Sequence, residues 1–231
     1  MPNKFKFGKD PEEGFVEHLM IALFNGWIDV DNELLKKFFQ KASPKLRGYA
    51  AQFLTTGFKP EKESGEDYRE VSERLRTHWK KRLDVIKYDP NANIEEAIGF
   101  TGWIKDSLLE PNETLELLEQ TLQLSGGRLG KLRDTRDFID GVCELGKGNE
   151  FTALRCLKIA AAEEEMRMPW ARYQDPLIGF LKSIADLPAD YDSIEDIRTE
   201  AIAVADSYGS LHPDKFREVW FKLSQKDKKG L

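Results

Sequence analysis

The chain has few of the residues from which metal sites and disulfides are built. Its 231 residues include two cysteines and three histidines. The histidines, His18, His78 and His212, are far apart and lack the spacing of metal ligands, so we expect no metal site. The cysteines, Cys143 and Cys156, lie in apolar helical stretches, where we expect reduced thiols of the core. The sequence contains no cofactor-binding motif, so we expect no cofactor.

Long apolar runs are also missing. The longest, from Leu19 to Phe24, is far shorter than the ~20 residues that cross a bilayer. The first residues show neither the apolar stretch nor the cleavage site of a secretory signal. We therefore expect a cytoplasmic chain that does not enter membranes. Its net charge of -6 disfavours a general attraction to nucleic acid or to anionic lipid.

The sequence lacks strand patterns and has many helix starts. No comparable run alternates apolar and polar residues as a half-buried strand would. Instead, apolar stretches of helical period follow Asp10-Pro11, Ser43-Pro44, Glu110-Pro111 and Asp175-Pro176. Proline at the first helical position gives up only an amide hydrogen that has no partner there. The sequence therefore predicts an all-α protein of roughly eleven helices.

One stretch of the chain is a candidate linker. Residues 59–65 are polar and include Pro60 and Gly65, which favour an irregular connection. After it, a long and highly charged helix is predicted from about Glu66 to Lys87. We expect a single elongated domain over residues 1–231, with the alternative that it divides at this linker into 1–58 and 66–231.

The short connections between predicted helices favour antiparallel neighbours. Each hairpin can bury its apolar stripe only by stacking on the next. The helix starts are irregularly spaced and match neither the tetratricopeptide nor the ankyrin pattern. We therefore expect an irregular stack of antiparallel helical hairpins, either a HEAT-like α-solenoid or a right-handed superhelix.

Two motifs that suggest chemistry do not fit the residues around them. Residues 125–132 contain a Gly-Lys pair near their end and so resemble a phosphate-binding loop. Ser125, however, stands where such a loop has its first glycine, and Leu132 stands where it has its magnesium-binding hydroxyl. A helix-ending loop is the better interpretation. The acidic triplet 163–165 could supply carboxylates, but consecutive helical residues point in different directions. A solvated helix end is therefore expected there.

The most basic stretch of the chain lies in the long predicted helix around Trp79. Cations of this kind contact phosphates, and an interleaved aromatic ring can stack on a base. Acidic residues such as Glu70, Glu73 and Asp84 lie within helical reach, however, and favour an ordinary solvated face. If the stretch does bind nucleic acid, the candidate contact residues are Arg74, Arg76, Lys80 and Lys81.

A second cluster lies between two predicted helices. Loops present side chains to partners, and Trp, Tyr and Arg contribute most to many protein interfaces. The candidate partner-binding residues are Arg167, Trp170, Arg172 and Tyr173. The alternative is that Trp170 fills the seam between two hairpins.

The second half of the chain, from about Trp103 to Leu223, resembles the helical C-terminal region of large bacterial multidomain proteins of the antiphage and STAND-ATPase kind. The features that carry the resemblance are residues 122–127 at a helix end, residues 153–157 in the next hairpin, and Trp170 before a capped helix with Ile178. No ATPase or effector domain accompanies them. The resemblance implies a recognition or scaffolding region and carries over no catalytic residue.

Three functions remain open at this point. We expect a protein-interaction or scaffolding module without enzymatic activity, with an unidentified protein partner, as in a bacterial defence or signalling system. The alternative is a helical nucleic-acid-binding protein that uses the helix from Arg74 to Lys87. A small-molecule enzyme with carboxylates between its helices is a distant third.

Overall fold

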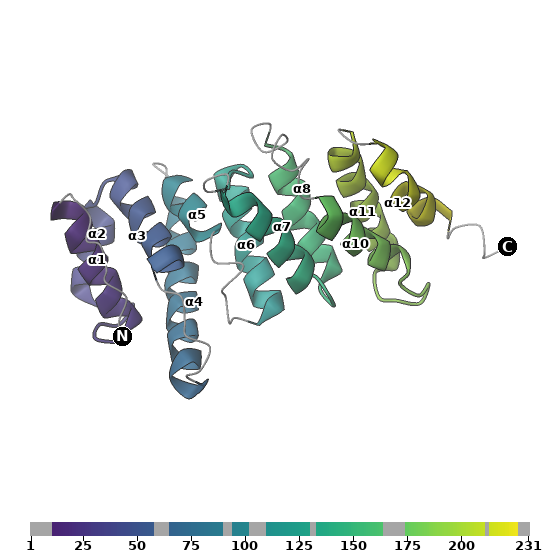
Figure 1. Ribbon diagram of the computed structural model, residues 1–231. Helices are drawn as coiled ribbons and strands as arrows, with labels where there is room; N and C mark the ends of the chain where they lie inside the picture. The colour runs from purple at the N-terminus through teal and green to yellow at the C-terminus, as the bar shows by residue number, and fades with distance from the viewer. Residues whose placement is uncertain are drawn as a thin grey trace. The chain divides into compact units, whose positions relative to one another are not determined.

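The computed structural model describes residues 11–57, 65–89, 94–101, 110–129, 133–163, 174–210 and 213–225. Over these residues the chain forms eleven α-helices and no strand (Figure 1), so the predicted all-α class is confirmed. Proline is the first residue of four of the helices, as its preference for that position leads one to expect. In the described part of the chain, no helix is long and apolar enough to cross a membrane.

By its internal contacts the chain divides into two compact units, Met1–Leu109 and Glu110–Leu231. The division differs from the alternative boundary at residues 59–65, because the helices on either side of that stretch belong to the same unit. The described helices of the first unit are α1 (Pro11–Phe24), α2 (Glu33–Lys41), α3 (Pro44–Gly57), α4 (Gly65–Tyr88) and α5 (Ile94–Phe100).

Helices α3 and α5 make the closest approach in the first unit, and glycine permits it. A Cβ on Gly99 would lie 2.7 Å from the Cβ of Ala51 and 3.0 Å from the carbonyl oxygen of Gly48. A Cβ on Gly48 would in turn lie 2.9 Å from the carbonyl oxygen of Glu95. Neither position has room for a side chain, so the two helices pack backbone against backbone.

The core of the first unit takes one face from each helix. Helix α1 contributes Val16, Met20 and Leu23, while α4 contributes Trp79 and Leu83. The ring of Trp79 stacks on Phe100 of α5, with 5.7 Å between ring centroids. Trp79 is fully buried, so the aromatic residue of the basic stretch is part of the core and cannot stack on a base.

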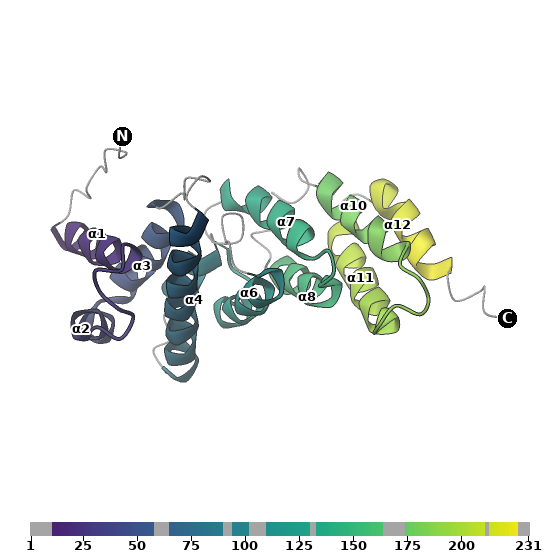
Figure 2. The same ribbon diagram turned by 90° about the horizontal axis from the view of Figure 1, so that it is seen from below.

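The second unit has six described helices in two layers. One layer contains α6 (Pro111–Ser125), α8 (Glu150–Ala161) and α11 (Ile194–Gly209). The other contains α7 (Arg133–Leu145), α10 (Gln174–Ala185) and α12 (Pro213–Gln225). Figure 2 shows both rows, each with its helices side by side.

Polar bonds join neighbouring helices within each layer. The ammonium of Lys158 on α8 pairs with Glu200 of α11 at 2.8 Å, and Lys182 on α10 pairs with Glu218 of α12 at 2.6 Å. In the interior, the Tyr208 hydroxyl donates a hydrogen bond of 2.8 Å to the Leu157 carbonyl. Because exposed ion pairs contribute little, the buried apolar faces supply most of the stability.

The stretch that resembles a phosphate-binding loop ends helix α6. Gly126 takes a left-handed conformation (φ 65°), and the Gly127 amide donates a hydrogen bond of 2.8 Å to the Leu122 carbonyl. This is the glycine-dependent way in which many helices end. A Cβ on Gly127 would lie 2.4 Å from the carbonyl oxygen of Ile159, so this loop packs against α8. Over the described residues 125–129 the interpretation as a helix-ending loop is confirmed, and residues 130–132 lie outside the described residues.

Candidate functional site

Of the four candidate nucleic-acid contacts, Arg74 is held most firmly within the protein. Its guanidinium donates a hydrogen bond of 2.8 Å to the Phe24 carbonyl, at the end of α1, and pairs with Glu70 at 2.9 Å. A Cβ on Gly26 would lie 2.7 Å from the same guanidinium. A cation at a helix C-terminus stabilises the unpaired carbonyls there. Arg74 therefore caps α1.

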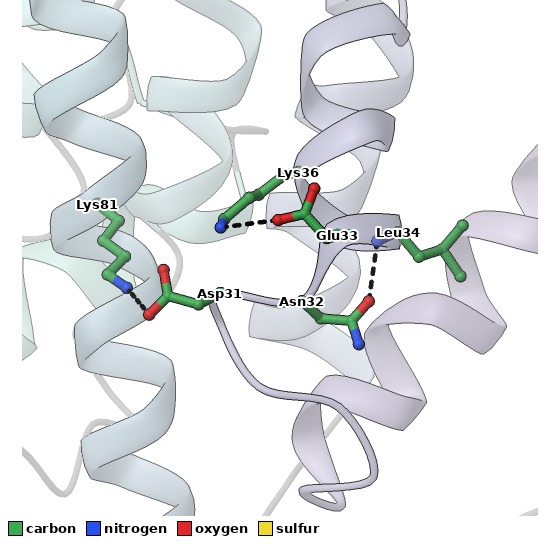
Figure 3. A network of polar contacts seen from close by, with 6 residues as sticks. All are labelled: Asp31, Asn32, Glu33, Leu34, Lys36 and Lys81. Carbon is green, nitrogen blue, oxygen red and sulfur yellow. Dashed lines mark hydrogen bonds and ion pairs between the residues drawn. The ribbon is translucent and has the colours of Figure 1, made fainter.

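Two more of these cations already have acidic partners. Arg76 pairs with Glu73, one turn earlier on α4. Lys81 pairs with Asp31 at 2.7 Å, next to Asn32, whose side chain caps α2 by accepting a hydrogen bond from the Leu34 amide (Figure 3). The Lys81 bond thus ties α4 to the start of α2.

Lys80 is the remaining candidate contact, and it is exposed. It has no ion pair with any residue in the described part of the chain. The structure therefore does not bring the four cations together on one free surface. A phosphate backbone is bound by several cations at once, and α4 presents one of the four unpaired.

Behind these surface contacts, α4 carries a buried cluster of polar residues. Arg82 donates hydrogen bonds of 2.6 and 3.2 Å to the two carboxylate oxygens of Glu96, and its guanidinium lies 4.1 Å from the centre of the Phe39 ring. The His78 ring lies 5.2 Å from Phe39 and 6.3 Å from Phe100, measured between centroids. The cluster joins α2, α4 and α5.

The surroundings of His78 keep its imidazole neutral. Burial lowers the pKa of His78 to about 3, with further contributions from the charges of Arg82 and Lys81. Its Nε2 is buried and has no hydrogen-bond partner. A general base needs a pKa near the working pH, so His78 is suited to packing. His18, by contrast, is exposed and hydrogen-bonds through Nδ1 to the Gly14 carbonyl oxygen at 2.7 Å.

Both cysteines are buried and free, as expected. Burial raises the pKa of the Cys143 thiol to about 12 and raises that of Cys156 further. Because the thiolate is the nucleophilic form, these two groups are unreactive. Among the residues that the structure describes, no group of three or more His, Cys, Asp and Glu side chains could hold a metal ion.

An exposed apolar surface lies where α1 meets α2, at the contact between the rings of Phe15 and Phe38. Phe15 on α1 is 48% exposed and Leu34 on α2 is 51% exposed. Between them is the half-buried Phe38, whose ring centroid lies 6.3 Å from that of Phe15 and which follows Leu34 by one turn. We call these three residues the α1–α2 surface. Contiguous apolar residues of this kind mark interaction sites more often than isolated ones do.

Helix α2 separates its apolar residues into two faces. Leu35 and Phe39 are buried against the unit, whereas Leu34 and Phe38 lie on the outer side. In Figure 3 the Leu34 side chain points away from α4, while Lys36 points toward it and pairs with Glu33 at 3.1 Å. The outer side of α2 therefore carries an apolar pair, Leu34 and Phe38, of which Leu34 is not covered by the unit.

The sequence interpretation did not single out the α1–α2 surface. Helical spacing groups Phe15 with other apolar residues of α1, and Leu34 and Phe38 with those of α2, without indicating which of them are exposed. The signal that was present is the two adjacent apolar pairs of α2, Leu34-Leu35 and Phe38-Phe39, because neighbouring helical residues cannot both face the same side. The other predicted contact residues, Arg167, Trp170, Arg172 and Tyr173, lie outside the described residues.

No protein-family model matches the chain, and no curated protein and no solved structure matches it.

Proposed function

We propose that the chain is a protein-interaction module without catalytic activity and that the α1–α2 surface is its binding site. The observation that carries the proposal is the exposure of Phe15 and Leu34 on either side of Phe38. Exposed aromatic and aliphatic groups that form one patch gain free energy when a partner covers them, at about 25 cal/mol per Å² of apolar area. Single exposed apolar residues elsewhere, such as Phe221 on α12, do not need this explanation.

The charges of α4 favour this proposal over nucleic-acid binding. Arg74 serves the end of α1, Arg76 and Lys81 have acidic partners, and Trp79 is buried. Binding to phosphates would require these cations to exchange contacts within the protein for contacts with the nucleic acid. Such an exchange reduces the net free energy of binding that each contact with a phosphate contributes.

The buried titratable groups support the absence of catalysis. His78 is held neutral between two aromatic rings, and both cysteines are held as thiols. Groups in these states neither transfer protons near neutral pH nor attack an electrophile. His78 contributes to packing inside the first unit, and the two cysteines contribute to packing inside the second.

In the wider proposal, the module belongs to an irregular HEAT-like α-solenoid that serves as a recognition region in a bacterial defence or signalling system. The two layers of the second unit support the idea of stacked hairpins, because each helix has a neighbour in its own layer. Arg167, Trp170, Arg172 and Tyr173 remain a proposed second contact region of the same module.

Co-purification from the native cell tests the proposal. The tagged chain is compared with the variant Phe15→Ser/Leu34→Ser and with the control Phe221→Ser, each with and without nuclease. Phe221 is 60% exposed and lies on the other unit, so it controls for the loss of an exposed apolar residue. We expect a protein that is captured by the wild type and the control, is lost with the double variant, and is insensitive to nuclease. Capture that depends on nucleic acid would contradict the proposal.

A further inference from the structure

The border of the α1–α2 surface carries positive charge on its α2 side. Lys37 and Lys41 follow Leu34 and Phe38 by three residues each, which places them beside the apolar pair on the outer face of the helix. Both lysines are exposed, and neither has an ion pair with a residue that the structure describes. Lys36, on the side toward α4, is by contrast paired with Glu33.

The α1 side of the border is less available to a partner. Glu12 precedes Phe15 by one turn and already interacts with another residue of the chain. His18 follows Phe15 by one turn and bonds to the Gly14 carbonyl oxygen. Among the described residues, the unpaired charges at the border are therefore those of Lys37 and Lys41, and a complementary partner carries carboxylates.

The form of the partner follows from the helices that present the surface. Across the described residues there is no strand whose edge could add a further strand. Apolar side chains from two neighbouring helices instead suit the apolar face of a third helix, whose anchors recur every three or four residues.

Two other occupants fit less well. The chain's own residues 1–10 contain Lys4, Lys6 and Lys9 against a single acid, Asp10, so they share the sign of the border. A second copy of the chain is the stronger rival. Residues 110–231 contain 23 acidic and 17 basic residues, a net charge of -6, whereas residues 1–109 contain 18 of each. Self-association is therefore an outcome that the test must distinguish.

We propose that the α1–α2 surface binds an amphipathic helix whose apolar face is flanked by Asp or Glu, with Lys37 and Lys41 pairing with these carboxylates. The inference rests on the proposed function and adds the chemical class of the partner. Apolar contact supplies most of the affinity, and the two lysines select the partner by charge.

Two synthetic peptides of about 18 residues, or five helical turns, serve as probes. They share one apolar leucine face, and its flanks carry Glu in one peptide and Lys in the other. Each is titrated against the full chain by calorimetry or fluorescence anisotropy. The variants are Lys37→Glu/Lys41→Glu, the matched control Lys80→Glu, which reverses another exposed and unpaired lysine, and Leu34→Ser. Sedimentation of the free chain gives its oligomeric state.

We expect the Glu peptide to bind at least about tenfold more tightly than the Lys peptide, a difference of 1.4 kcal/mol. Lys37→Glu/Lys41→Glu should reverse this preference, Lys80→Glu should keep it, and Leu34→Ser should weaken both peptides. If the two peptides bind equally and Leu34→Ser weakens both, the inference of an acidic partner is overturned, but the α1–α2 surface remains the binding site. Binding of neither peptide at about 1 mM would overturn the inference, and the co-purification then decides the proposed function separately. If the free chain self-associates and Lys37→Glu/Lys41→Glu abolishes this self-association, the occupant of the surface is a second copy of the chain, and the inference is also overturned.

Discussion

His78 and Arg82 lie one turn apart on α4 and both are buried, but only Arg82 has a charged partner among the described residues. The Arg82 guanidinium, which is charged as in every arginine, donates two hydrogen bonds to the Glu96 carboxylate. His78 has the rings of Phe39 and Phe100 beside it and no hydrogen-bond partner at Nε2. Burying a charge is unfavourable unless it is paired. Glu96 of α5 therefore supplies the partner that the buried guanidinium needs, whereas burial without such a partner keeps His78 in its neutral form.

This difference predicts how stability depends on pH. The pKa of His78 falls from 6.5 to about 3 on folding, so below pH 6.5 the unfolded chain takes up a proton that the folded chain excludes. Stability is complete above the unfolded pKa and is lost as pH falls toward the folded value. Between about pH 7.5 and about pH 5, His78 should lower the free energy of unfolding by about 2 kcal/mol.

Urea unfolding at these two pH values measures the effect. In His78→Gln, which does not titrate, the decrease should be smaller by that amount. The matched control His18→Gln changes an exposed histidine and should show the same decrease in the free energy of unfolding as the wild type. An equal decrease in the wild type and in His78→Gln would show that the imidazole is not held neutral.

Removing the partner of Arg82 should be costly. Glu96→Gln leaves the guanidinium buried beside an uncharged amide, and the loss of one member of a buried pair typically destabilises by about 3–5 kcal/mol. Asp31→Asn, which breaks the exposed pair with Lys81, should barely change the free energy of unfolding, because solvent screens that pair. Chemical denaturation of both variants provides the comparison. Similar effects of the two substitutions would contradict the role assigned to burial.

Among the elements, the crossing of α3 and α5 depends on small residues. Gly99→Ala would place a Cβ 2.7 Å from the Cβ of Ala51 and 3.0 Å from the backbone nitrogen of Gln52. Because the helices must shift to accept it, we expect a loss of about 1–3 kcal/mol. Gly14→Ala on α1 meets no atom within 4 Å and should be neutral or stabilise by up to about 1 kcal/mol. Thermal or denaturant unfolding checks both, and a Gly99→Ala protein as stable as the wild type would refute the close crossing.

The helices themselves were largely predictable from the sequence, and the contacts between them were not. Pro11 and Pro111 mark helix starts by local chemistry, and Gly126 ends a helix for a local reason, so a short stretch of sequence contains the information. Arg74 instead meets Phe24, and Lys81 meets Asp31, each 50 residues away. Helical periodicity identifies an apolar face but does not say whether a neighbouring helix covers it.

The α1–α2 surface illustrates this limit. Periodicity groups Phe15 with Leu19 and Leu23 on α1, and the structure buries the two leucines while leaving Phe15 half exposed. Similarly, Leu35 is buried on α2 and its neighbour Leu34 is not. Which residue becomes the contact surface depends on the packing of the whole unit, and no local pattern encodes it.

For the whole molecule, the engaged cations of α4 predict weak binding of nucleic acid. We expect no measurable binding of a single-stranded oligonucleotide at about 0.15 M salt, because Lys80 is the one candidate contact left unpaired on the described helix. Arg74→Ala should instead destabilise the protein through the lost cap of α1. Anisotropy titrations over a range of salt concentrations provide the measurement. A salt-sensitive affinity in the micromolar range or tighter, reduced by changing Arg74, Arg76, Lys80 and Lys81 to Ala, would restore the nucleic-acid function.

The central claim is that the α1–α2 surface is where a partner binds, and hydrogen–deuterium exchange tests it most directly. The full chain is labelled with and without a saturating amount of the Glu-flanked helical peptide. We predict that exchange slows in α1 and α2 by at least about tenfold at the most protected amides and is unchanged over residues 74–81 of α4. Exchange that the bound peptide slows only outside α1 and α2 would contradict the claim.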